Sequence, residues 1–173
     1  QRQMCIRDRY NINSQISDDI DQVNELGKTI SELNLQIQKI EAGNIETAMT
    51  LRDARDLALD ELASLVDISY KEEVNGVVRV SVEGNEFVNE NGYYKVEKQT
   101  DKATGFVTPY WSHLSDPDKG EYTYLFNFNR DISTENKNDM GEIKALVLAR
   151  GDKVANYKDI LGAVSYTHLR AHE

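Results

Sequence analysis

The sequence has few of the residues that mark several common classes of protein. Its 173 residues include one cysteine, two prolines, three histidines and one tryptophan. A single cysteine excludes a disulfide-stapled fold and any site that needs two thiols. Basic residues are scarce as well, because 20 Lys plus Arg stand against 30 Asp plus Glu and give a net charge of −10. We therefore expect no unaided binding to nucleic acid or to an anionic membrane.

Long hydrophobic runs are also missing. No apolar run approaches the roughly 20 residues that a membrane-spanning helix needs. Hydrophobic residues still make up 39% of the chain and charged residues 29%, which leaves enough apolar side chains for a modest core. The length is typical of one domain or of two small ones.

The two ends of the chain differ from its middle. Residues 1–9 hold three arginines and one aspartate, a local charge of +2, and residues 164–173 are neutral. Both strings resemble translated adapter sequence, and neither continues a neighbouring pattern. We interpret them as non-native flanks. They contain Cys5, His168 and His172, which we therefore do not take as metal ligands or nucleophiles.

Residues 10–68 are expected to form a long antiparallel helical hairpin that resembles a coiled coil. They contain no proline and, after Tyr10, no aromatic residue. Their apolar residues recur at alternating steps of three and four, as in the seam of a coiled coil. The polar residues between them should face solvent, so one narrow face should be buried. The predicted helix-packing seam comprises Ile16, Ile20, Val23, Leu26, Ile30, Leu33, Ile37 and Ile40.

The hairpin should contain a bend and a turn. Gly27 lies beside the seam, where glycine costs about 1 kcal/mol relative to alanine and favours a bend. The tripeptide Ala42-Gly43-Asn44 should end the first helix, and a second helix should run from about Glu46 to Val66. One narrow stripe per helix cannot close a core, so the hairpin should need further helices. The inner face of the second helix should contain Met49 or Leu51, then Ala54, Ala58, Leu62 and Leu65, while Arg52, Asp53, Arg55 and Asp56 should pair along its surface.

Residues 69–131 are expected to form a small antiparallel β region. Eleven of the 14 aromatic residues of the chain lie here, and the helical period disappears. The expected strands are 78–82, 87–88, 93–98 after an Asn91-Gly92 turn, 105–114 at a sheet edge because of Pro109, and an aromatic-faced strand over 122–128.

The remaining chain should return to the helix pair. Residues 132–141 are polar and are expected to form a loop. Residues 142–163 are expected to form a helical segment, because Ile143, Leu146 and Val147 follow helical spacing. The patterns together predict an α+β fold: a long antiparallel helical hairpin, a small antiparallel β-sheet and a returning helix.

No catalytic, cofactor or metal site emerges from the sequence. His113 is the only histidine between the flanks, and we interpret it as a surface strand residue. The run Asp116–Glu121 resembles half of a calcium loop, but the twelfth position would be Asn127 and the glycine comes one place early, so a turn is the better interpretation. The acidic run Asp18, Asp19 and Asp21 is expected on the solvated side of the first helix. We therefore do not expect an enzyme.

Several segments together carry a family resemblance. Leu51, Asp53, Arg55 and Asp56 form an L-x-D-x-R-D motif, which follows a long helix and a turn. The segment Gly141–Asp152 comes after the predicted sheet. In this order the sequence resembles the hook-associated proteins of the flagellar hook–filament junction, the FlgK family, over about residues 11–162.

The resemblance implies a structural subunit of the bacterial flagellum, with the motif acting in helix packing. It further implies export without a cleaved signal peptide, an extracellular location and a homo-oligomeric ring. The implied partners are the hook protein, a second junction protein and an export chaperone. Because the family's terminal and outer regions are not expected here, this chain alone should not polymerise properly.

Two other hypotheses remain open from the sequence. One is an unrelated surface or phage-tail-like interaction protein built on a coiled coil, which should show repeats or a signal peptide. The other is a fragment of an enzyme whose catalytic residues lie elsewhere.

Overall fold

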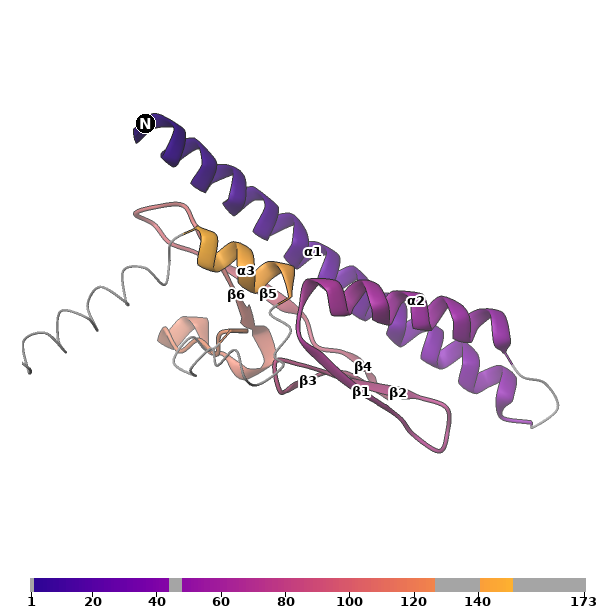
Figure 1. Ribbon diagram of the computed structural model, residues 1–173. Helices are drawn as coiled ribbons and strands as arrows, with labels where there is room; N and C mark the ends of the chain where they lie inside the picture. Colours follow the sequence, from indigo (N-terminus) through magenta and orange to yellow (C-terminus); the bar gives the residue numbers. More distant parts are fainter. Residues whose placement is uncertain (1, 44–47, 127–140, 151–173) are drawn as a thin grey trace, which may run out of the picture.

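The computed structural model describes residues 2–43, 48–126 and 141–150 (Figure 1). It contains two helices that run side by side, a four-stranded antiparallel sheet, a two-stranded antiparallel sheet and a short third helix. The hydrophobic core lies between the first helix and the elements packed against it. The predicted α+β fold, with a helical hairpin, a small antiparallel sheet and a returning helix, is confirmed.

The hairpin consists of α1, Arg2–Glu41, and α2, Met49–Leu65. The second helix is therefore shorter at both ends than predicted. α1 continues without a break through residues that we interpreted as a non-native flank at 1–9. The other predicted flank, residues 164–173, lies outside the described residues.

Gly27 allows close packing between α1 and the sheet. A Cβ atom at this position would overlap the ring of Phe87, which has no exposed surface. We predicted that this glycine favours a bend. The structure gives a steric reason for glycine at this position, because the aromatic ring lies directly against the helix backbone.

The four-stranded sheet has the simple order β1-β2-β3-β4, and every neighbouring pair is antiparallel. The valines of β2 at positions 78, 80 and 82 are buried and belong to the core, as their alternation predicts. The strands are β1 Ile68–Glu72, β2 Val78–Val82, β3 Asn85–Asn89 and β4 Gly92–Tyr93.

Two residues connect β2 with β3. Glu83 and Gly84 both have positive φ angles, 50° and 82°. This is the pattern of a two-residue hairpin turn whose twist matches that of the flanking strands.

The second sheet consists of β5, Val96–Thr100, and β6, Val107–Trp111. The predicted single strand over residues 93–98 is therefore wrong, because Tyr93 ends β4 of the first sheet and Val96 begins β5 of the second. The chain changes sheets between these residues.

Pro109 limits the pairing of β6 on its other side. As predicted, β6 is an edge strand of the two-stranded sheet, and residues 123–125 lie along its open side. Leu125 N donates to Pro109 O at 3.0 Å, but proline has no N–H with which to return a bond. Only an isolated bridge, Tyr110 to Tyr124, forms there. Residues 127 and 128 of the predicted aromatic strand lie outside the described residues.

The third helix, α3, spans Glu142–Ala149 and buries Ile143 and Val147 against α1 and α2. The rest of the predicted helical segment and residues 132–140 of the predicted loop lie outside the described residues. Two short 3₁₀ helices, η1 Ser112–Leu114 and η2 Pro117–Lys119, follow β6. Within the described ranges, no helix has the length and hydropathy to cross a membrane.

Candidate functional site

The predicted seam lines much of the contact between α1 and the rest of the molecule. Leu33, however, is half-buried, and Ile40 is 42% exposed. This corrects the predicted seam, because Ile40 is not packed in the core of this chain. The members that are buried are Ile16, Ile20, Val23, Leu26, Ile30 and Ile37.

Helix geometry explains why the seam ends early. Each residue adds a rotation of about 100°, so a strict heptad repeat drifts by about 20° per heptad in a straight helix. Counted from Ile16 at 100° per residue, Ile40 lies about 120° around the helix, at the rim of the buried face. The same rotation brings Asn34 to the same angle as Ile16, and Asn34 is 2% exposed. The expectation that Asp19 faces solvent is also wrong, since this residue is 3% exposed.

Arg55 is the only residue of the L-x-D-x-R-D motif that lies inside the described molecule. It is 2% exposed, whereas Leu51 is half-buried and both Asp53 and Asp56 are exposed. Burial lowers the pKa of the Arg55 guanidinium, while Glu72, 3.7 Å away, opposes that shift. The motif is thus divided between one buried cation and two surface carboxylates.

Arg55 joins α2 to α1 and to the hairpin between β1 and β2. Its Nη1 donates to Asn34 Oδ1 at 3.0 Å and to Gly76 O at 2.7 Å. Buried hydrogen bonds of this kind are costly to lose, because the partner groups would be left without water. The inner face predicted for α2 needs two corrections, since Met49 and Ala54 are exposed. The sequence analysis missed Arg55 and Leu59, which are buried there.

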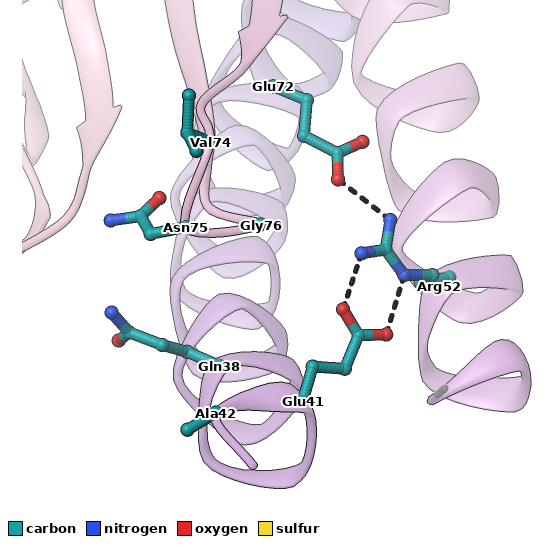
Figure 2. A pocket seen from close by; sticks show the side chains of 8 residues that line it. All are labelled: Gln38, Glu41, Ala42, Arg52, Glu72, Val74, Asn75 and Gly76. Carbon is teal, nitrogen blue, oxygen red and sulfur yellow. Dashed lines mark hydrogen bonds and ion pairs between the residues drawn. The ribbon is translucent and has the colours of Figure 1, made fainter. Parts of the chain in front are cut away.

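Arg52 forms a second link at the same end of the molecule, shown in Figure 2. Its Nε and Nη2 donate to the two carboxylate oxygens of Glu41 at 2.8 and 2.5 Å, and its Nη1 donates to Glu72 at 2.7 Å. Glu41 also accepts a bond from Ala48 N at 2.9 Å. The bonds from Arg52 and Ala48 lower the pKa of Glu41 to about 2. Arg52 therefore pairs between elements and not along α2 as predicted.

Asparagines on α1 hold the first residues of strands. Asn34 Nδ2 donates to Val78 O at 3.0 Å, and Val78 N donates to Asn34 Oδ1 at 3.1 Å. Asn24 makes the same pair of bonds with Val96, at 2.8 and 2.9 Å. A side-chain amide carries one donor and one acceptor group, so it can bond a strand residue as a neighbouring strand would. These contacts fix where β2 and β5 begin.

A third asparagine acts at β6. Val107 N donates to Asn13 Oδ1 at 2.8 Å. Asn13, Asn24 and Asn34 form a row along α1, and a buried arginine bonds to the asparagine at each end. Arg55 donates to Asn34, and Arg150 donates to Asn13 Oδ1 at 2.7 Å and to Val107 O at 2.6 Å. The signal that could have revealed the row is the separation of its asparagines, 11 and 10 residues, because about three helical turns bring each to one side of α1.

The outer side of the hairpin carries a groove between α1 and α2. Its hollow of about 350 Å³ is apolar at its base and is flanked by Glu25 and Glu61. Leu57, at its side, is 61% exposed. The other lining residues are Gln22, Leu26 and Thr29 from α1, and Ala54 and Ala58 from α2.

Two carboxyl groups, one buried and one half-buried, lie near the start of α3. Asp19 on α1 and Glu83 in the β2–β3 turn each have one oxygen without a hydrogen-bond partner. Burial is the main cause that raises the pKa of both groups. The charge of Glu142 raises the pKa of Asp19 further, whereas Lys144, 4.0 Å from Glu83, lowers that of Glu83.

The residues that the sequence analysis considered for catalysis or metal binding make structural contacts. The His113 ring stacks on Tyr94 with centroids 3.9 Å apart, and burial lowers its pKa. The run from Asp116 to Glu121 is a turn, as predicted, with η2 at its centre and an isolated bridge between its ends. Within the described part of the chain, no three His, Cys, Asp or Glu residues are grouped as metal ligands would be.

A family model named for the helical domain of the flagellar hook-associated protein FlgK matches residues 7–171. The chain belongs to this family. The resemblance seen over residues 11–162 is thereby confirmed, and FlgK membership argues against an unrelated coiled-coil or phage-tail-like protein. No curated protein matches the chain.

The fold resembles a solved FlgK structure. The match is to the flagellar hook junction protein FlgK from Burkholderia pseudomallei, with a TM-score of 0.62 and 24% sequence identity. It covers 86% of this chain and 25% of that protein, so this chain spans about a quarter of the solved protein's length. At this identity the likeness concerns the fold.

Proposed function

We propose that this chain is the helical part of a structural subunit at the hook–filament junction of a bacterial flagellum. The observation that carries the proposal is the FlgK family match over nearly the whole chain. The chain would act through helix packing and subunit assembly and would catalyse no reaction. Its location would be extracellular, after export without a cleaved signal peptide.

The shape of the hairpin supports an assembly role. The seam and the asparagine row attach one side of α1 to the sheets, while the groove around Leu57 stays open on the outer side. An open apolar groove between two helices can accept a further helix. That helix would come from the rest of a longer protein or from a neighbouring subunit.

The proposed partners follow from this role. Copies of the protein would form a ring that contacts the hook protein on one side and a second junction protein on the other. An export chaperone would hold the subunit before assembly. In this proposal, the buried Arg55 of the motif keeps the hairpin rigid and the exposed Asp53 and Asp56 remain on its surface.

A chimera tests the proposal. In a bacterium that lacks its own junction protein, a FlgK whose helical domain is replaced by residues 10–163 of this chain should restore filaments and swimming. Leu57→Asp should prevent filament growth while the chimera is still secreted, and Leu57→Met is the matched control. A stable, secreted chimera that leaves the cells without filaments would contradict the proposal.

A further inference from the structure

Asparagine is followed directly by glycine at two places in the chain, Asn75-Gly76 and Asn91-Gly92, and each pair lies where one strand turns into the next. Both glycines have positive φ angles, 81° and 145°, so both turns favour glycine. Because glycine has no side chain to shield its backbone nitrogen, the side chain of a preceding asparagine can reach that nitrogen and close a succinimide ring. Both turns therefore carry the sequence that deamidates most readily.

The first pair is held in place by its surroundings. Asn75 Oδ1 accepts a hydrogen bond from Val77 N at 3.1 Å, and Gly76 N donates to Glu73 O at 2.9 Å. Gly76 is buried, and its carbonyl oxygen accepts the bond from Arg55 at 2.7 Å. Ring formation would have to break the bonds of both residues and move Gly76 away from a buried arginine. The fold should therefore protect this pair.

The immediate neighbours of Gly76 strengthen this protection. A Cβ atom on Gly76 would lie 3.6 Å from Arg52 Nη2 and 3.6 Å from Glu41 Oε2. Figure 2 shows this glycine beside the ion pair that Arg52 forms with Glu41. The turn is thus fastened to α1 and to α2, and its backbone cannot open without disturbing both helices.

The second pair has fewer ties. Asn91 is exposed, and its side-chain amide has no hydrogen-bond partner among the described residues. Gly92 pairs with Asn89 across the hairpin, but it begins β4, a strand of two residues at the edge of the sheet. Short pairing at an edge opens locally at a low cost in free energy. The Asn91 side chain can therefore reach the Gly92 nitrogen whenever this end of the hairpin opens.

We propose that Asn91 is a site of spontaneous deamidation in the folded protein and that the fold protects Asn75 from the same reaction. The backbone nitrogen of Gly92 attacks Cγ of Asn91, and a bond forms between these two atoms. The bond from Cγ to the side-chain nitrogen breaks, and that nitrogen leaves as ammonia with the proton lost by Gly92 N. Water, the only co-reactant, then opens the ring at either carbonyl and leaves aspartate or isoaspartate at position 91.

The reaction changes both the charge and the backbone of this turn. It adds one negative charge next to Glu90, which lies 3.8 Å from Arg79, in a chain whose net charge is −10. Isoaspartate also inserts a carbon atom into the backbone, which lengthens the turn where Asn89 pairs with Gly92. Because the reaction needs only water and time, its extent records the age of the folded protein. The site stands independently of the proposed function.

Peptide mass spectrometry on the full chain tests the proposal. Trypsin separates the two asparagines into peptides 72–79 and 80–95. The folded chain is kept at mildly alkaline pH, and the mass gain from amide to acid is followed in each peptide over time. Deamidation at Asn91 should be at least about tenfold faster than at Asn75. Equal rates, or a faster reaction at Asn75, would overturn the proposal.

The chain unfolded in guanidinium chloride is the control for the effect of sequence. Both asparagines precede glycine, so without the fold they should react at similar rates. The rate at Asn75 should therefore rise most on unfolding. If Asn75 stayed slow in the unfolded chain, its protection by the fold would be excluded.

A substitution at the proposed site identifies the reacting residue. Asn91→Gln should abolish the mass gain in peptide 80–95, because the longer side chain closes a ring far more slowly. Persistence of the gain in this variant would assign the reaction to Asn85 or Asn89 and would overturn the proposal.

A substitution at Arg55 tests the protection of the other pair. Arg55→Ala removes the donor to Gly76 O and should speed deamidation at Asn75 at least about fivefold while the rate at Asn91 stays the same. An unchanged rate at Asn75 in the folded variant would contradict its protection through Gly76. If the variant does not fold, the comparison of the folded with the unfolded chain decides.

Discussion

The C-terminal end of α1 and its middle bury polar groups in opposite ways. At the end, Arg52 and Arg55 meet Glu41 and Glu72, so opposite charges lie together. Around the middle, Asp19 is buried among apolar residues with one oxygen unbonded. Ion pairs thus hold the end, whereas apolar packing in the middle buries a carboxyl group that forms no ion pair with any described residue.

The largest expected effect comes from placing a second carboxylate in the middle. Ile30 has no exposed surface, so Ile30→Asp would bury an unpaired charge. We expect a loss of at least about 4 kcal/mol in the free energy of unfolding, with collapse of the helical circular dichroism signal. Ile40→Asp is the control, because Ile40 is 42% exposed. Equal urea midpoints for the two variants would contradict the buried seam.

The next effect concerns the charged end. Arg55→Ala leaves Asn34 and Gly76 O without their buried donor and should lower the free energy of unfolding by about 3 kcal/mol. Asp53→Ala, in the exposed part of the same motif, should change it by less than about 0.5 kcal/mol. Urea unfolding measures both. If the two losses were alike, Arg55 would not be the structural member of the motif.

A smaller effect tests close packing in the middle. Alanine normally favours a helix over glycine by about 1 kcal/mol, but Gly27→Ala should destabilise the protein by about 2 kcal/mol because its Cβ meets Phe87. Adding Phe87→Leu should recover part of this loss relative to Phe87→Leu alone. The sign of the change decides the matter, since a stabilised Gly27→Ala variant would mean that the ring does not press on the helix.

The smallest expected effect is a difference between the two regions in how their stability depends on pH. The raised pKa of Asp19 contributes stability that is complete below its ordinary value of 3.8 and is lost as the pH rises through the folded value. Asp19→Asn should remove this loss and raise the free energy of unfolding at pH 7 by about 1 kcal/mol.

Glu41 has the opposite dependence. Its pKa is lowered to about 2, so its contribution is present above its ordinary value of 4.5 and is lost as the pH falls toward 2. In Glu41→Gln the decline between pH 4.5 and 2 should become shallower. Unfolding curves across pH 2 to 7 for both variants provide the test, and parallel profiles would show that the two regions do not differ in charge balance.

Sequence analysis predicts an element correctly where the element depends on a local pattern. The alternating valines of β2 predict a strand because the side-chain period of a strand is two. The Asn91-Gly92 signal also indicates a hairpin, yet the turn residues are Glu90 and Asn91, and Gly92 already pairs with Asn89. Such one-residue differences depend on which partner residues meet across the strands.

The misplaced strand over residues 93–98 has a tertiary cause. Nothing between Tyr93 and Val96 breaks the extended pattern, so the sequence predicts one strand. In the structure Tyr94 N bonds Phe87 O at 2.8 Å, while Asn24 takes both backbone groups of Val96. The boundary is therefore set by α1, some 70 residues earlier in the chain.

The sequence by itself determined the α+β class, the two long helices, the β2 strand and the family resemblance, because each depends on local periodicity or on short motifs. The tertiary structure alone decided that Arg55 and Asn34 lie inside, that Ile40 lies outside and that asparagines on α1 begin the strands. A polar residue is buried when a partner of matching geometry lies opposite it, and that partner comes from distant parts of the chain.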